Sequence, residues 1–185
     1  MRVCIIGHGP SAKGKMLGRA IDAHDVVIRH VECDWQNPSD YGTRYDIGIF
    51  CPEPMFVALD AQWVPDQYWF YDPSGTQAPL KEFRGRRCQS LTKIVNPLIN
   101  GRHFSRGVAA AIAAIKILEP EELSLVGFDA VMNGQFNENH HHPLLREMLM
   151  SRYKDMPNLD THDWAKENRI IHELTEERKV CLTVL

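Results

Sequence analysis

Short runs of apolar residues alternate along this chain with segments in which apolar positions follow a helical period. The runs predict strands at 3–6, 25–29, 45–50, 67–71, 123–127 and 179–185. The periodic segments predict helices at 15–22, 55–61, 105–118, 143–153 and 162–178, with Ser105 and Thr161 as N-caps. Residues 130–142, rich in Asn and His, indicate a loop, and residues 72–104, rich in Pro, Gly and Arg, give no definite pattern.

Strands that alternate with helices in a chain of 185 residues predict one α/β domain spanning residues 1–185. The apolar runs are continuous rather than alternating, which is typical of strands buried on both faces. We therefore expect a Rossmann-like fold, a mainly parallel sheet with helices on both faces.

Composition and charge narrow the class of protein. Hydrophobic residues make up 44% and charged residues 24%, the proportions of an ordinary globular domain. A net charge of −3 argues against a domain that wraps nucleic acid, although a nucleic-acid acceptor approached through a local patch stays open.

The five cysteines are odd in number and form no CxxC pair, and Cys4 and Cys181 lie in apolar, strand-like runs. This usage favours a reducing compartment. No apolar run reaches the length of a membrane span, and the first run ends at Gly7, too early for a signal peptide. We expect a cytoplasmic protein without stable membrane insertion.

A glycine-rich turn, Gly7–Ser11, follows the first predicted strand. Glycines let a backbone approach a ligand, and the start of a helix offers amide groups to a phosphate. The spacing is neither GxGxxG nor a Walker A loop, so a dinucleotide or ATPase site is not supported. The alternative is a plain tight turn.

His162 and Glu167 stand at the start of the last predicted helix, about one and a half turns apart. A carboxylate in the first turns of a helix can orient or tune a neighbouring imidazole. By itself this spacing is a weak signal of chemistry.

Two segments near the start of the chain resemble the long sialyl motif of sialyltransferases. Val3–Ser11 is similar to its strand and glycine turn, and Ile21–Arg29 is similar to its "Ile-Asp-Ser-His-Asp-Val-Val-Ile-Arg" segment. The Gly-x-Gly-Pro-Ser turn also resembles that of the small bacterial sialyltransferases.

Later segments resemble the remaining motifs of the same family, in the same order. Ser105–Val108 and Leu123–Asp129 are similar to the short motif, and His162–Glu167 to the very short motif. His140, His141 and His142 lie where the family has a His-Tyr-Tyr segment. The resemblance spans most of the chain and implies a GT-A-like sialyltransferase variant of the α/β fold.

The resemblance implies an inverting displacement, without metal at the catalytic centre, in which a sugar passes from a nucleotide donor to an acceptor hydroxyl. The default donor is cytidine monophosphate–sialic acid, a substrate rather than a bound cofactor. The family's base corresponds to His162, and a histidine pKa near neutrality suits that role. Glu167 would orient the imidazole, and one of His140, His141 and His142 would assist the leaving phosphate.

Candidates for the donor site come from the turns and strand ends that carry the motifs. Arg29 faces an anion or forms an internal ion pair, and Arg106 is suited to a carboxylate or phosphate. The full set is Gly7, His8, Gly9, Pro10, Ser11, Arg29, Cys51, Ser105, Arg106, Gly107, Phe128 and Asp129.

Departures from the family concentrate on the donor side, where His8, Val31 and Cys51 stand in place of asparagines. Three alternatives therefore remain. The chain can use another nucleotide sugar with a non-glycan acceptor such as a modified nucleobase, or it can be a non-catalytic nucleotide- or glycan-binding module. A histidine-dependent metal hydrolase ranks lowest, since no HExxH, finger or DxD-like motif is present.

Overall fold

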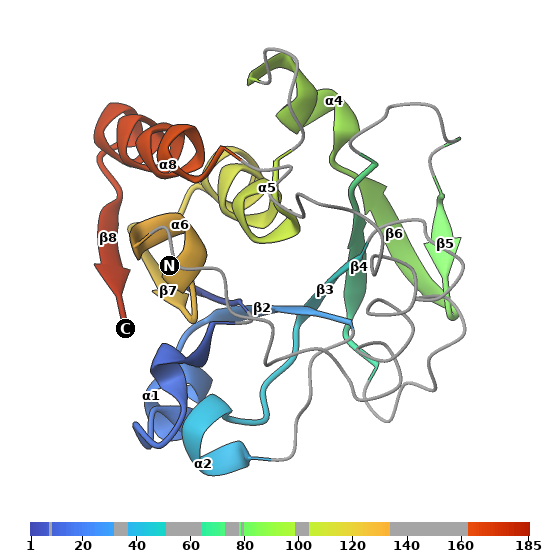
Figure 1. Ribbon diagram of the computed structural model, residues 1–185. Helices are drawn as coiled ribbons and strands as arrows, with labels where there is room; N and C mark the ends of the chain where they lie inside the picture. Colours follow the sequence, from blue (N-terminus) through green and yellow to red (C-terminus); the bar gives the residue numbers. More distant parts are fainter. Residues whose placement is uncertain are drawn as a thin grey trace, which may run out of the picture.

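The computed structural model describes residues 1–7, 9–31, 37–50, 64–72, 78, 80–98, 104–133 and 163–185. These residues form an eight-stranded sheet with helices on both faces (Figure 1). The predicted α/β class, with a mainly parallel sheet, is confirmed.

The strands are β1 (Arg2–Ile6), β2 (Val26–His30), β3 (Ile47–Phe50), β4 (Gln67–Phe70), β5 (Glu82–Phe83), β6 (Arg86–Ser90), β7 (Glu122–Val126) and β8 (Cys181–Val184). Their order across the sheet is β5-β6-β4-β3-β2-β1-β7-β8. Neighbouring strands are parallel except β5 and β6, which form an antiparallel hairpin. β1 and β3 are buried on both faces along most of their length, which explains their continuous apolar sequences.

The helices are α1 (Gly18–Asp22), α2 (Pro38–Tyr41), α4 (Thr92–Val95), α5 (Arg106–Ala113), α6 (Asp129–Asn133) and α8 (Trp164–Arg178). Single 3₁₀ turns lie at Pro10–Ala12 and Asn96–Leu98, and a π-helical stretch, Ala114–Leu118, continues α5. In Figure 1, α4, α5 and α8 lie on one side of the sheet, and α1 and α2 on the other.

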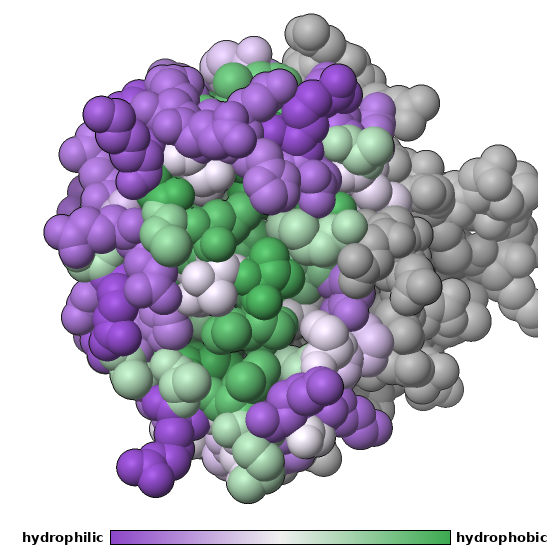
Figure 2. Space-filling view, turned by 90° about the vertical axis from the view of Figure 1, so that its left-hand side faces the viewer, coloured by the Kyte–Doolittle hydropathy of each residue, from purple (hydrophilic) through white to green (hydrophobic). Residues whose placement is uncertain are grey.

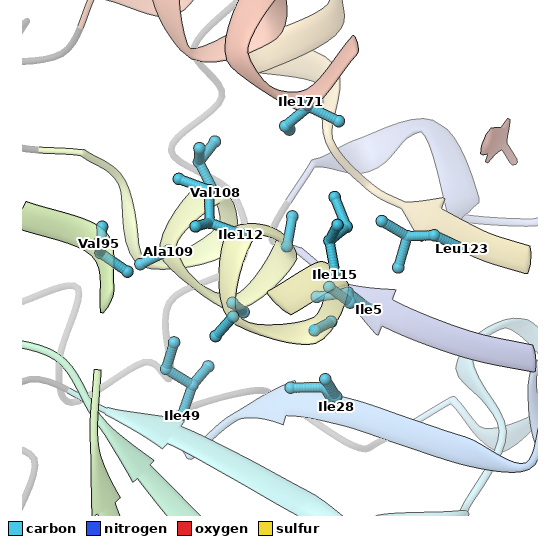
Figure 3. Close-up of a cluster of buried hydrophobic side chains, with 14 of the residues drawn as sticks. Ile5, Ile28, Ile49, Val95, Val108, Ala109, Ile112, Ile115, Leu123 and Ile171 are labelled. Carbon is cyan, nitrogen blue, oxygen red and sulfur yellow. The ribbon is translucent and has the colours of Figure 1, made fainter. Parts of the chain in front are cut away.

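The main core lies between the sheet and α5 (Figure 3). Every residue of α5 from Val108 to Ala113 is buried, and most of them are alanines. Small side chains let the helix approach the sheet closely, where Ile5, Ile28 and Ile49 pack against it. This packing fixes the start of α5 relative to the carboxyl ends of the central strands.

Several predictions about elements need correction. Asp163, rather than Thr161, caps α8, because its side chain accepts from the Lys166 amide. α6 occupies the start of the predicted 130–142 loop, and β5, β6 and α4 lie in the stretch that gave no pattern. The first helix begins at Gly18, since Gly14 and Met16 have positive φ angles. The helices predicted at 55–61 and 143–153 lie outside the described residues.

Cys4 and Cys88 are buried, whereas Cys181 is exposed on β8. Burial raises the pKa of the Cys4 thiol to about 12 and that of the Cys88 thiol to about 11. In the described ranges, no helix combines the length and the apolar character that a membrane crossing requires.

Candidate active site

The strand order reverses at β1, which lies between β2 and β7. The chain builds outward from β1 through β2, β3 and β4, and later returns to place β7 on the other side. In open parallel sheets, ligands bind at the carboxyl ends of the strands beside such a reversal. The turns that follow β1 and β7 therefore define the candidate site.

These two turns are bonded to each other. The Gly9 amide donates to the Gly127 carbonyl at 2.7 Å, and the Gly7 amide donates to the Val126 carbonyl at 2.7 Å. The Ser11 hydroxyl donates to an Asp129 carboxylate oxygen at 3.0 Å. The first turn is thereby held against the second, although the two are far apart in sequence.

The glycines of the first turn are required by this contact. A Cβ at Gly7 would lie 2.5 Å from the Gly127 carbonyl oxygen, and one at Gly9 would overlap the Asp129 carboxylate. The sequence suggested that these glycines admit a ligand, but the described contacts give them a packing role. Pro10 begins the 3₁₀ turn that follows.

The start of α5 lies beside the end of β7. A Cβ at Gly107 would lie 3.2 Å from the Phe128 ring, so that ring packs directly on the first turn of the helix. Ser105 caps α5 as predicted, with its hydroxyl oxygen accepting from the Val108 amide at 3.2 Å. The positive end of the α5 dipole, with half-buried Arg106, thus lies at this edge of the sheet and suits an anion.

Glu167 joins the start of α8 to the start of α5. Its side chain is 0% exposed. One carboxylate oxygen accepts from the Ser105 amide at 2.9 Å, and the other accepts from the Ser105 hydroxyl at 2.7 Å. These bonds bring into contact the segments that resemble the very short and short motifs. His162, which Glu167 was expected to orient, lies outside the described residues.

Arg29 is 1% exposed on β2. Its Nε donates to the Arg44 carbonyl at 2.7 Å, and its Nη2 lies 3.8 Å from an Asp22 carboxylate oxygen. Of the two roles considered for Arg29, these contacts favour the internal ion pair.

The sequence interpretation missed His30, which is 3% exposed at the carboxyl end of β2. Its Nε2 lies 3.9 Å from the position that a Cβ on Gly107 would take. Its imidazole is therefore close to the first turn of α5. The available signal was a second polar residue, directly after Arg29, at the end of the apolar run Val26–Ile28.

His24, by contrast, has a structural role. Its Nε2 lies 2.9 Å from the Ser124 hydroxyl of β7, and its Nδ1 lies 2.9 Å from the Ala20 carbonyl. Nδ1 donates to that carbonyl, because a carbonyl oxygen only accepts. The Ser124 hydroxyl also lies 3.4 Å from a Glu122 carboxylate oxygen, to which it donates. These contacts attach the end of α1 to the sheet.

Other predicted site residues, His8, Cys51, His140, His141, His142 and His162, lie outside the described residues. Within the described ranges, no three His, Cys, Asp or Glu side chains are grouped as a metal site would require. The described residues therefore place the start of a helix at a sheet reversal, where it is bonded to the buried Glu167 carboxylate. A helix start in such a position is suited to an anionic ligand.

No protein-family model matches the chain, and no curated protein matches its sequence. A crystal structure of a mammalian sialyltransferase is similar to it, with a TM-score of 0.64 and 16% identity over 100% of this chain and 68% of that chain. A mammalian sialyltransferase in complex with Gal-beta-1-3GalNAc-ortho-nitrophenol gives a TM-score of 0.62 and 16% identity, with the same coverage. The fold is sialyltransferase-like, as the motif resemblance implied.

Proposed function

We propose that this chain is a glycosyltransferase that moves a sugar, by default sialic acid from its cytidine monophosphate donor, to an acceptor hydroxyl. The observation that carries the proposal is a continuous set of contacts, Gly9 to Gly127, Phe128 to Gly107, and Ser105 to Glu167. These contacts join the segments that resemble the sialyl motifs. They lie at the sheet reversal of a sialyltransferase-like fold, where a ligand is expected.

In the proposed reaction the acceptor oxygen attacks the anomeric carbon while the bond from that carbon to the phosphate oxygen breaks. His162 takes the hydroxyl proton, and the nucleoside monophosphate leaves with the bonding electrons. The first turn of α5, with Arg106, would stabilise the negative charge of the donor. Glu167 would hold this turn in place through Ser105. The displacement inverts the anomeric centre and needs no metal ion.

Val31 supports a second candidate, a nucleotide-binding module or an enzyme with another donor. The family has an asparagine at this position, whereas the Val31 side chain here packs against the aromatic cluster of Phe50, Tyr68 and Phe70. An apolar side chain in an apolar setting forms no hydrogen bond to a nucleotide.

Release of free nucleotide from a panel of nucleotide sugars tests the proposal, with His162→Ala and His172→Ala as a matched pair. His172 is an exposed histidine on α8, ten positions further along. We expect His162→Ala to lower kcat by about 10²- to 10⁴-fold, because a general base contributes that much, while donor KM changes little. His172→Ala should behave as the wild type.

A His162→Ala protein with full turnover would contradict the base assignment. Nucleotides that raise the Tm without being released from any donor would favour the binding module. Loss of activity on chelation would contradict the metal-independent reaction.

A further inference from the structure

The β5–β6 hairpin is a strongly basic feature at the edge of the sheet away from β8 (Figure 1). Residues 81–87 contain Lys81, Arg84, Arg86 and Arg87 against a single acid, Glu82. The chain as a whole has a net charge of −3. The hairpin therefore creates a local positive field on a chain whose net charge is negative.

The shape of the hairpin is fixed by its turn. Phe83 pairs with Arg86, so Arg84 and Gly85 form a two-residue turn, and both have positive φ angles, 50° and 70°. These are the signs of a type I′ turn, whose twist matches that of the strands. Nothing lies within 4 Å of a Cβ built on Gly85, so the turn projects into solvent.

Three of the four basic side chains are open to a ligand. Lys81, Arg86 and Arg87 are exposed. Within the part of the chain that the structure describes, no carboxylate forms an ion pair with any of these three. Arg84 is held differently, since its guanidinium lies 5.0 Å from the centroid of the Phe83 ring.

We infer that this hairpin, residues 81–87, is a binding site for an anionic oligosaccharide that carries carboxylate or sulfate groups. Two of its three exposed cations, Arg86 and Arg87, are arginines, whose planar guanidinium groups bind such oxyanions in a bidentate way. The hairpin lies at the amino ends of β4 and β6, four strands from β1, on the order of 20 Å from the candidate active site. It is therefore a second site, separate from the place of reaction.

Two other anionic partners fit less well. Duplex nucleic acid favours domains with a net positive charge, and this chain is acidic. A membrane surface favours an apolar side chain at the tip, but the turn carries only Arg84 and Gly85, and Phe83 is 8% exposed. The choice of a glycan rests in part on the proposed glycosyltransferase function.

Binding of a fluorescent sulfated oligosaccharide at low salt tests the inference without any turnover, so its outcome is independent of the proposed reaction. The test variant is Lys81→Gln/Arg86→Gln/Arg87→Gln. The matched control is Lys13→Gln/Lys15→Gln/Arg19→Gln, which removes the same charge from exposed positions around the start of α1. We expect about a tenfold loss of affinity for the hairpin variant and less than twofold for the control, since each exposed charge contributes modestly.

A milder variant, Arg86→Lys/Arg87→Lys, keeps the charge but removes bidentate binding, and should give an intermediate affinity. Circular dichroism of each variant verifies that it is folded. Equal losses in the hairpin variant and the control would overturn the site. A single-stranded oligonucleotide of equal charge that binds more tightly, with the same dependence on the hairpin, would overturn the glycan assignment.

Discussion

Gly9 and Gly85 are glycines for different physical reasons. At Gly9 the backbone is extended, but a side chain would collide with the Asp129 carboxylate and lie 2.7 Å from the Gly127 carbonyl oxygen. At Gly85 there is open space, and the φ angle of 70° is what disfavours other residues. Neighbouring atoms exclude a side chain at Gly9, whereas the backbone conformation disfavours one at Gly85.

We therefore predict unequal costs for the same change at these two positions. Gly9→Ala should lower the free energy of unfolding by at least about 2 kcal/mol, because the turn after β1 and the turn after β7 must separate to admit the methyl group. Gly85→Ala should cost only about 1 kcal/mol, the penalty of a left-handed conformation. Urea unfolding of both variants measures the two losses of stability. Equal losses would mean that the turns after β1 and β7 are not in contact.

At the scale of elements, α2 determines the path of the chain into α1. The Asp40 carboxylate accepts from the Gly14 amide at 2.6 Å, the Met16 amide at 2.9 Å and the Asn37 side chain at 2.6 Å. Met16 is held with a φ of 56°, an uncommon conformation for a residue with a side chain. The hydrogen bonds donated by the Gly14 and Met16 amides hold the pKa of the Asp40 carboxyl below its usual value.

This lowered pKa predicts a pH dependence. The carboxylate stabilises the fold above the unfolded pKa of about 3.9, and its contribution falls as the pH drops toward the lower folded pKa. Asp40→Asn should thus be less stable than wild type at pH 7, with a difference that narrows below pH ~4. The urea midpoints of Asp40→Asn and of the wild type, at pH 7 and below pH ~4, measure this difference in stability. Asp66→Asn, at an exposed position, should show no such change, and a pH-independent difference would contradict the role of Asp40.

The elements also show what a sequence can predict. A strand at 25–29 was expected because residues 26–28 are all apolar, as in a strand buried on both faces, and the structure places it one position later, at Val26–His30. The β5–β6 hairpin was not expected, because its exposed Glu and Arg residues show neither the helical nor the strand period of apolar positions. Its structure is determined by the pairing of β6 with β4. Ser105 was expected as a cap from local signals, but its bonds to Glu167 join residues 62 positions apart, which no local pattern contains.

At the scale of the whole molecule, the two edges of the sheet differ. The β5 edge is two residues long and charged, which discourages pairing with another chain. The β8 edge carries Val184, 50% exposed, and half-buried Leu182 and Leu185. On that side, Figure 2 shows an apolar band bordered by polar side chains.

Hydrogen exchange should reveal the open β8 edge. Cys181 donates to the Glu121 carbonyl and Leu185 to the Leu125 carbonyl, each at 2.9 Å, so Thr183 also faces β7. The Leu182 and Val184 amides therefore point away from the sheet. We predict that they exchange much faster than the Thr183 amide, and that β1 amides exchange slowest. Equal protection of all three β8 amides would mean that another strand covers this edge.

The position of β1 between β2 and β7 has a consequence for synthesis. β1 leaves the ribosome well before β7, one of its two neighbours in the sheet, since the paired residues Arg2 and Glu122 are 120 positions apart (122 − 2). At ordinary elongation rates, that interval lasts on the order of ten seconds. During this time an apolar strand lacks one of its two neighbours in the sheet, and unpaired apolar segments of this kind are prone to associate with other chains.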